Sequence, residues 1–199
     1  MITRKEMTRM LLKEGLLSCL ANNSFESVTV TSLCKASGIT RSTFYLHYSN
    51  IMEIVDDLVD DAIAYSKPGM VDNNNLQIIA NTLSAASNSI SLREAYDSIF
   101  DRLPLCQRII RHKKYLPLFL DEQISEYVLQ RIIGREKDRQ GLVIAESLGI
   151  SFDVGVSVFV FLVHGLYAVN KQYKWSQSDE WLEAQKIIFE LVYRGLQRR

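Results

Sequence analysis

The chain has 199 residues, of which 47% are hydrophobic and 23% are charged, as expected of a soluble globular protein with one or two domains. Its formal net charge is zero, which argues against a protein that simply coats nucleic acid. The three cysteines form no CxxC pair and the N-terminus is too polar for a secretory signal, so we expect no disulfide framework, no zinc site and a cytoplasmic location.

The first predicted helix covers residues 3–21. Its apolar side is assigned to Met7, Met10, Leu11, Leu17 and Leu20. Three basic residues lie near the start of this helix, where they oppose the helix dipole: Arg4, Lys5 and Arg9. A nearby phosphate would explain this placement, and a solvated helix face is an equally good alternative. We expect Asn22 and Asn23 to end the helix in a left-handed cap, and Phe25 to fill the small core beneath the next helices.

Residues 29–48, TVTSLCKASGITRSTFYLHY, predict two short helices joined by a tight turn. The first has apolar or small residues spaced three and four apart, as one buried face requires: Val30, Leu33, Cys34 and Ser37. Thr29 is placed to cap this helix. Gly38 stands where the chain must turn sharply and needs a positive φ angle.

The second short helix begins after Thr40, which is its predicted cap. Phe44 and Tyr48 form its inward face because they lie four residues apart. The outward residues are Arg41, Ser42, Thr43, Tyr45 and His47. Two helices in this arrangement form a helix-turn-helix, whose second helix fits the major groove of DNA.

This stretch resembles the DNA-binding domain of the TetR family of regulators. The resemblance is carried by Thr29-Val30, Leu33-Cys34, Gly38-Ile39-Thr40 and above all STFYLHYS at residues 42–49. It covers the first quarter of the chain, and the rest is similar only in helical layout and length. Three positions depart from the family pattern, where threonine, an acidic residue and glycine are usual: Val28, Ser32 and Ser42. Ile51 replaces a lysine that usually helps hold a phosphate, and isoleucine has no side-chain group for that contact.

The resemblance implies roles for individual residues. Those expected to face bases or the nearest phosphates are Thr40, Arg41, Ser42 and Thr43. Arg41 is the side chain suited to bidentate recognition of guanine. Those expected to contact or support phosphates are Tyr45, His47, Thr29, Thr31 and Lys35. A surface histidine without a partner is the alternative for His47.

A linking helix is predicted at residues 51–67, opened by Asn50 and Glu53 at capping-box spacing. Its apolar side comprises Ile51, Ile54, Val55, Leu58, Val59, Ala62 and Ile63. The other side carries four carboxylates, which we interpret as a solvated stripe and not a metal site: Asp56, Asp57, Asp60 and Asp61. A polar, proline-containing stretch follows. We therefore predict a DNA-binding domain at residues 1–50 and a ligand-binding and dimerisation domain at residues 68–199.

The body is predicted to be helical, which makes the fold all-α. Its helices are placed at residues 76–90, 92–103 and 118–133. The charged run GREKDRQG at residues 134–141 is interpreted as a surface loop or a frayed helix end.

The segment Val154–Val163, VGVSVFVFLV, favours a strand by propensity, yet no partner strand is visible. Only about ten apolar residues lie between Asp153 and His164, too few to span a membrane. We therefore predict a helix buried on nearly all sides, followed by a last helix at residues 179–197. The apolar face of the last helix comprises Trp181, Leu182, Ile187, Ile188, Leu191, Val192 and Leu196. The resemblance implies that these two helices form a four-helix bundle with their mates in a homodimer.

An effector pocket is expected in the body, because ligand sites in helical domains are mostly apolar with a few polar tips. The candidate wall residues are Phe100, Leu103, Cys106, His112, Tyr115, Phe119, Tyr127, Phe159, His164 and Tyr167. Ordinary core packing is the alternative for each. These side chains permit a flat, hydrophobic or weakly anionic molecule, whose identity the sequence does not give.

Catalysis is not predicted, because the chain has no GxGxxG, GxxxxGK[ST] or HExxH motif. Cys106 and His112 are only a weak sign of a thiol pair, and neither a cofactor nor a metal is expected. The function indicated is a dimeric, ligand-responsive regulator that binds double-stranded DNA, with repression favoured by the resemblance and activation as the alternative. A helical ligand-binding or adaptor protein that does not read a DNA sequence is the rival interpretation.

Overall fold

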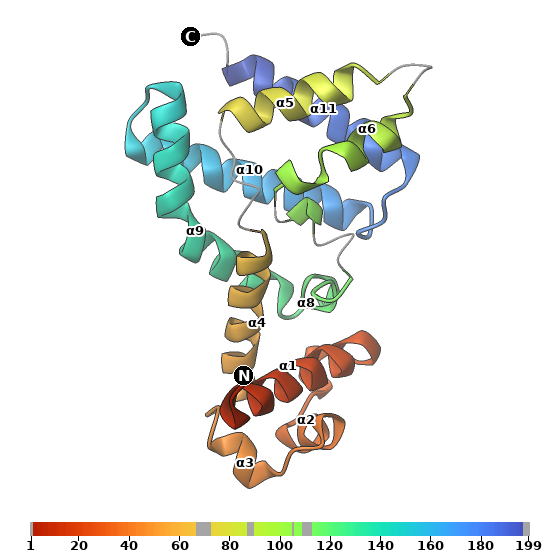
Figure 1. Cartoon of the computed structure of the whole chain (residues 1–199), viewed down its shortest axis with the longest axis vertical. Helices are drawn as coiled ribbons and strands as arrows, with labels where there is room; N and C mark the ends of the chain where they lie inside the picture. The colour runs from red at the N-terminus through yellow and green to blue at the C-terminus, as the bar shows by residue number, and fades with distance from the viewer. Residues whose placement is uncertain (1, 67–72, 87–89, 105, 109–112, 197–199) are drawn as a thin grey trace. The chain divides into compact units, whose positions relative to one another are not determined.

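The computed structural model describes residues 2–66, 73–86, 90–104, 106–108 and 113–196 (Figure 1). The α-helices in this part of the chain are α1 (Arg4–Asn22), α2 (Val30–Ser37), α3 (Arg41–Tyr45), α4 (Ile51–Ser66), α5 (Asn73–Ser84), α6 (Leu92–Ser98), α8 (Pro117–Leu120), α9 (Ser125–Leu148), α10 (Phe152–Gln172) and α11 (Asp179–Leu196). Short 3-10 helices occupy Phe25–Ser27 and Phe100–Arg102. The predicted all-α class is confirmed.

The chain forms two compact units. The head unit comprises Met1–Tyr65 and His112–Ile132, and the body unit comprises Ser66–Arg111 and Ile133–Arg199. Thus α4, α8 and the first part of α9 belong with the helix-turn-helix. The residues around the predicted boundary at 67–68 lie outside the described ranges, and the functional division at that point stays a prediction.

Helix α1 packs on α2 through a different face from the predicted one. Met7, Met10 and Leu11 are 42%, 40% and 40% exposed, so their assignment to the buried stripe was wrong. The buried residues of α1 are Thr8, Leu12, Gly15, Leu16, Leu17 and Leu20. Gly15 sets this register, because a Cβ there would lie 2.8 Å from the Cβ of Ser37 in α2. No larger residue fits at this helix crossing.

Helix α1 does not end in the expected left-handed cap. Asn23 has extended backbone, with φ −144° and ψ 156°, and its N–H donates to the carbonyl of Cys19. Phe25, which we expected to fill the core, is only half-buried. Its backbone N–H donates to Asp121 at 2.6 Å, which joins this turn to the segment after α8.

The acidic face of α4 is not the solvated stripe that we predicted. Asp57 accepts hydrogen bonds from Arg9 and from the hydroxyl of Tyr48, and Asp61 forms an ion pair with Lys13. Both basic residues belong to α1, so the carboxylates join α1 to α4. The pattern looked solvated because these partners lie 48 residues away in the sequence.

A third carboxylate of α4 turns toward α9 within the head unit. Asp56 accepts a hydrogen bond from the hydroxyl of Tyr127 at 2.7 Å and lies 3.1 Å from Nε of Arg131. The apolar side of the same helix is buried as predicted, with Ile54, Val55 and Leu58 fully enclosed. Helix α4 therefore contacts its neighbours through both sides.

The body helices differ from prediction in their ends. Helix α5 begins at Asn73 and ends at Ser84, and α6 ends at Ser98 before the 3-10 helix at Phe100–Arg102. The predicted helix at 118–133 is two helices, α8 and α9. Asp121 separates them, because its Oδ1 accepts from the backbone N–H groups of Gln123 at 2.9 Å and Ile124 at 3.1 Å.

The prediction of a break at residues 134–141 was wrong, since α9 runs unbroken from Ser125 to Leu148. Most residues of GREKDRQG are good helix formers. Its second glycine has a packing role, because a Cβ on Gly141 would lie 2.5 Å from Cγ2 of Val156 in α10. A Cβ on Gly155 would in turn overlap the carbonyl oxygen of Gly141. The two glycines let the backbones of α9 and α10 approach closely.

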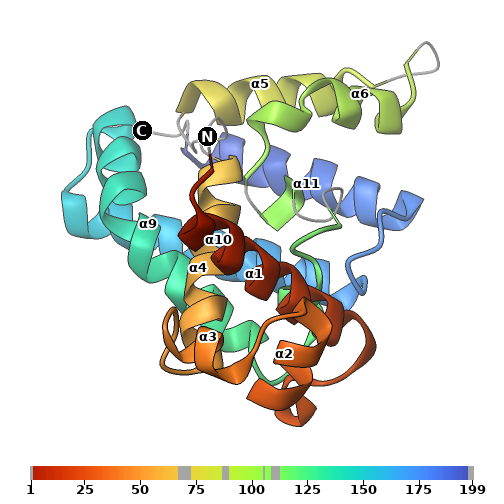
Figure 2. The same ribbon diagram turned by 60° about the horizontal axis from the view of Figure 1, so that its bottom comes forward.

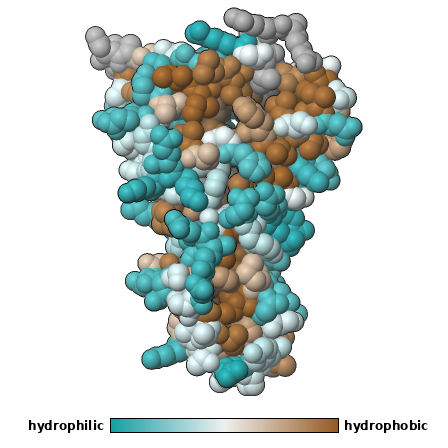
Figure 3. All heavy atoms as spheres, turned by 180° about the vertical axis from the view of Figure 1, so that it is seen from behind, coloured by the Kyte–Doolittle hydropathy of each residue, from teal (hydrophilic) through white to brown (hydrophobic). Residues whose placement is uncertain are grey.

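Helix α10 is confirmed as a helix, but it is not buried on nearly all sides of the single chain. Phe152, Val154 and Phe161 are 43%, 44% and 72% exposed. Broad hydrophobic areas are visible in Figure 3, which views the molecule from behind.

Helix α10 is long and apolar enough to cross a membrane by length and composition alone, because it continues beyond the ten residues that we counted, past His164 to Gln172. Within the body unit, Gly155 of α10 packs on α9, and Asn170 of α10 accepts a hydrogen bond from Trp181 of α11. Helix α11 in turn lies along α5 (Figure 2).

Candidate nucleic-acid interface

Helix α2 has the predicted bounds, Val30–Ser37, and the predicted cap. Oγ1 of Thr29 accepts from the backbone N–H of Ser32 at 3.1 Å, and Oγ of Ser32 accepts from the N–H of Thr29 at 2.9 Å. Ser32 therefore completes a capping box in place of the acidic residue usual in the TetR pattern. Gly38 follows with φ 66° and ψ 24°, which confirms the left-handed turn between the helices.

Helix α3 is positioned by its cap and by one buried ring. Oγ1 of Thr40 accepts from the backbone N–H of Thr43 at 3.2 Å. Phe44 is fully buried, and its ring lies 5.1 Å from the ring of Tyr45 and 6.3 Å from the ring of Tyr48. Since Phe44 fixes the inward side of so short a helix, the opposite side is held toward solvent.

The predicted DNA-contacting residues lie on α2, on α3 and at the ends of these helices, which are side by side in Figures 1 and 2. The exposed ones are Thr29, Thr31, Lys35, Thr40, Arg41, Ser42 and Tyr45. Thr43 and His47 are half-buried. The helix-turn-helix thus brings the predicted set together at one place, and the role of each residue stays a prediction.

His47 is less available than we expected. Its Nδ1 is buried and has no hydrogen-bond partner in the described part of the chain. Only Nε2 is therefore left to make the predicted phosphate contact.

A charged cluster holds the helix-turn-helix in place, and sequence reasoning missed it. The guanidinium of Arg9 in α1 binds Asp57 of α4 and lies 4.9 Å above the ring of Tyr48, just after α3. Its hydrogen bond to Asp57 raises the pKa of Arg9. Burial, followed by the hydrogen bond to Asp57, raises the pKa of Tyr48 well above its ordinary value. Arg9 is thus engaged in internal contacts, which neither interpretation of its position had anticipated.

Leu46 is a second feature that the sequence analysis did not select. It lies at the C-terminal end of α3 and is 81% exposed. The available signal was its spacing, because it follows Ser42 by four residues and therefore shares the outward face.

The predicted pocket residues do not form one group. In the body unit, Leu103, Phe159 and Tyr167 are buried, whereas Phe100, Cys106 and His164 are half-buried. In the head unit, Tyr115 and Phe119 are buried and Tyr127 is exposed. His112 lies outside the described residues. The hydroxyl of Tyr127 is engaged by Asp56, and the carbonyl of Cys106 accepts from Asn170 at 3.3 Å.

Burial raises the pKa of the Cys106 thiol to about 12. At neutral pH this thiol is therefore protonated. A protonated thiol is a poor nucleophile.

The core of the body unit contains a chain of buried amides. The hydroxyl of Tyr96 donates to Oε1 of Gln107 at 3.2 Å, and Nε2 of Gln107 donates to Oε1 of Gln185 at 2.8 Å. Gln107 and Gln185 are both fully buried. Nε2 of Gln185 and the hydroxyl of Tyr167 are buried and have no hydrogen-bond partner among the residues that the structure describes. Buried polar atoms of this kind usually have a partner, so these two can serve a bound molecule or water.

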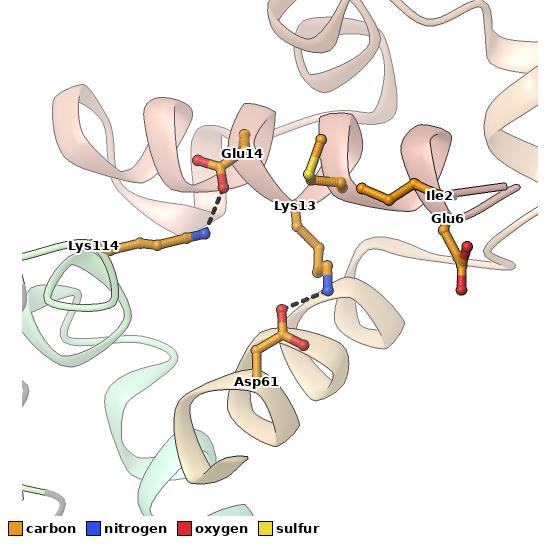
Figure 4. A pocket seen from close by; sticks show the side chains of 7 residues that line it. Ile2, Glu6, Lys13, Glu14, Asp61 and Lys114 are labelled. Carbon is orange, nitrogen blue, oxygen red and sulfur yellow. Dashed lines mark hydrogen bonds and ion pairs between the residues drawn. The ribbon is translucent and has the colours of Figure 1, made fainter. Parts of the chain in front are cut away.

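An open cavity of about 480 Å³ in the head unit is lined by Ile2, Glu6, Met10, Lys13, Glu14, Asp61 and Lys114 (Figure 4). Its lysines are already engaged, Lys13 with Asp61 and Lys114 with Glu14 at 2.6 Å. These charges satisfy one another, so they give no sign of a ligand.

The helices and the exposed face of α3 define an all-α protein with an N-terminal helix-turn-helix. No family model and no curated protein matches the sequence. Among solved structures, the chain is similar to the crystal structure of AlkX, a TetR family repressor from a Dietzia species that is implicated in the biodegradation of n-alkanes. The two are 15% identical over 96% of this chain and 95% of that chain, with a TM-score of 0.43.

Proposed function

We propose that the chain is a ligand-responsive transcriptional regulator that binds a palindromic operator as a homodimer and represses transcription from it. The observation that carries this proposal is the helix-turn-helix. Its second helix is anchored by Phe44 and presents Arg41 and Ser42 to solvent. A fixed helix with exposed polar side chains at its start is suited to enter the major groove.

Dimerisation is proposed through α10 and α11. Large apolar side chains are exposed on both helices, with Phe161 at 72%, Ile187 at 48% and Leu191 at 66%. A second copy would cover this apolar surface and add a second recognition helix. Two recognition helices about one DNA turn apart recognise the two halves of a palindrome. One short helix alone makes too few base contacts to specify a site.

The effector is proposed to bind in the body unit. Nε2 of Gln185 and the hydroxyl of Tyr167 are buried polar groups in this core that have no hydrogen-bond partner among the described residues. An effector that binds more tightly to the protein conformation unable to bind DNA increases the population of that conformation. The protein then dissociates from the operator. The protein is expected to act in the cytoplasm, and no step of the proposed mechanism requires a cofactor.

The test is an electrophoretic mobility shift of the purified protein on its own upstream region, titrated with salt and unrelated competitor DNA. We expect a discrete complex that survives competitor and weakens steeply as salt rises, because phosphate contacts release counterions. Arg41→Ala should lower operator affinity by about tenfold or more, because one bidentate guanine contact is lost.

The matched control is Arg139→Ala, which removes an exposed arginine from α9, where Arg139 pairs with Glu136 of the same helix. It should bind the operator as the wild type does. No complex with wild type at low salt would contradict the proposal and favour the rival, a helical ligand-binding or adaptor protein.

Repression is tested separately with a reporter fused to the protein's own promoter. Deletion of the gene should raise reporter output. A fall would show that the protein activates transcription.

A further inference from the structure

The recognition helix exposes one large apolar side chain that hydrogen bonding to DNA cannot explain. Leu46 is 81% exposed, more than any other large hydrophobic residue in the described part of the chain. Its backbone stays helical, with φ −75° and ψ −17°, so it extends the face of α3 by one further position. A leucine in that position has no group with which to bind a phosphate.

The direction of Leu46 follows from helix geometry. Each residue turns an α-helix by about 100°, so the residues two before and two after Phe44 both lie about 160° from it. These residues are Ser42 and Leu46. Because Phe44 is fully buried, both occupy the outward side of α3. They are four residues apart and therefore adjacent on that side.

We infer that Leu46 contacts the 5-methyl group of a thymine in each half-site of the operator. This inference rests on the proposed function, because it requires α3 to enter the major groove. The thymine methyl is the apolar group that base pairs present there, and apolar side chains recognise it. Leu46 lies about 6 Å along the helix axis from Ser42, a distance of roughly two base steps. The thymine is therefore placed one or two base pairs from the pair that Ser42 faces.

The experiment uses an operator selected by the wild-type protein from random duplexes. Each thymine is replaced in turn by deoxyuridine, which lacks only the 5-methyl group. At one thymine per half-site, wild-type affinity should fall about fourfold, the effect of removing one methyl group from an apolar contact. Replacement in both half-sites should lower it roughly fifteenfold if the two contacts are independent.

Leu46→Ala assigns the contact to this residue. The variant should bind the thymine operator more weakly than wild type and should bind thymine and deoxyuridine operators equally well. The matched control is Leu120→Ala, which removes the same atoms from a 52% exposed leucine of the head unit outside the helix-turn-helix. It should keep the wild-type discrimination.

Two results would overturn the inference while leaving the proposed function intact. One is a wild-type complex that is insensitive to every deoxyuridine substitution. The other is a Leu46→Ala variant that still discriminates at the same thymine, which would assign the methyl contact to another side chain. If wild type selects no operator at all, both the inference and the proposed function fail.

Discussion

The head unit and the body unit satisfy their internal polar groups in different ways. In the head unit, α4 is joined to its neighbours by carboxylates: Asp57 binds Arg9 and Tyr48, and Asp61 pairs with Lys13. The body unit also has ion pairs, such as those of Arg93 with Asp179 and Arg108 with Asp101, but the contacts that join α11 to Gln107 and to α10 are neutral. Gln107 binds Gln185, and Asn170 binds Trp181, all four of them fully buried.

This difference affects how each unit responds to its surroundings. Ion pairs between half-exposed groups are screened by salt and depend on protonation. Buried neutral amides respond weakly to both, but an amide that loses its partner inside a core is costly. The position of the helix-turn-helix should therefore vary with solution conditions more than the packing of the body does.

The largest expected effect is on the close contact between α9 and α10. In Gly155→Ala the new methyl group would overlap the carbonyl oxygen of Gly141, which is backbone and cannot rotate away. We expect a loss of about 2–3 kcal/mol in the free energy of unfolding. Both tryptophans, Trp175 and Trp181, belong to the body unit, so urea unfolding followed by tryptophan fluorescence measures it.

The control for this substitution is Gly134→Ala in the same unit. Nothing lies within 4 Å of a Cβ at that position, and it is inside α9. Gly134→Ala should raise the free energy of unfolding by up to about 1 kcal/mol, because alanine is a better helix former than glycine. Equal effects of the two substitutions would mean that α9 and α10 do not approach at Gly141.

The next effect concerns the neutral network. Asn170→Leu removes the acceptor of the Trp181 indole N–H, which is 3.0 Å away, and leaves that donor buried. The expected loss is about 2 kcal/mol. In the background Trp181→Phe, which has no indole N–H, Asn170→Leu should cost clearly less. The cycle is measured by urea unfolding followed by circular dichroism, and additivity would show that the bond contributes nothing.

The third effect is a pH dependence of the head unit. Burial, together with the bond to Asp57, raises the pKa of Tyr48 above its ordinary value of 10.0. The unfolded chain therefore loses this proton first. The contribution of Tyr48 to stability is complete below pH 10 and falls as the pH rises above that value.

Replacing Tyr48 by phenylalanine tests this dependence. Tyr48→Phe should be about 1 kcal/mol less stable than wild type at pH 7, because the hydrogen bond to Asp57 is lost. Its stability should also fall less steeply between pH 10 and 11. Urea unfolding at each pH gives the stability, and absorbance at 295 nm follows tyrosine ionisation. Tyr127→Phe is the comparison, since its more exposed hydroxyl should contribute less; the same alkaline slope in wild type and Tyr48→Phe would refute the assignment.

The local features of the head were predictable because their causes are local. Thr29, Gly38 and Thr40 act through residues within four positions of themselves, so short-range spacing was enough to place α2, the turn and α3. The carboxylates of α4 were misinterpreted for the opposite reason. An acidic face that meets basic side chains of a distant helix has the same sequence pattern as one that meets water.

The body shows the same limit in the case of glycine. The charged run GREKDRQG, bounded by Gly134 and Gly141, suggested a surface loop or a frayed helix end. In the structure α9 continues through this run, and Gly141 lies where α10 crosses it. A glycine can end a helix or allow a second helix to cross closely. Its tertiary contact with the neighbouring helix decides between these roles. Sequence spacing alone does not contain that information, and the same is true of the register of α1.

The smallest expected effect concerns the cap of α2, whose contribution to stability can be measured by substitution. Thr29→Ala removes the acceptor of the Ser32 backbone N–H and should lower stability by about 1 kcal/mol. Thr31→Ala, an exposed position inside the same helix, should be neutral or slightly stabilising, because alanine favours the helix interior. Hydrogen exchange of the α2 amides would locate the change. Faster exchange confined to α2 in Thr29→Ala would show that the cap fixes the helix beneath α3, whereas unchanged exchange would mean that packing through Leu33 is sufficient.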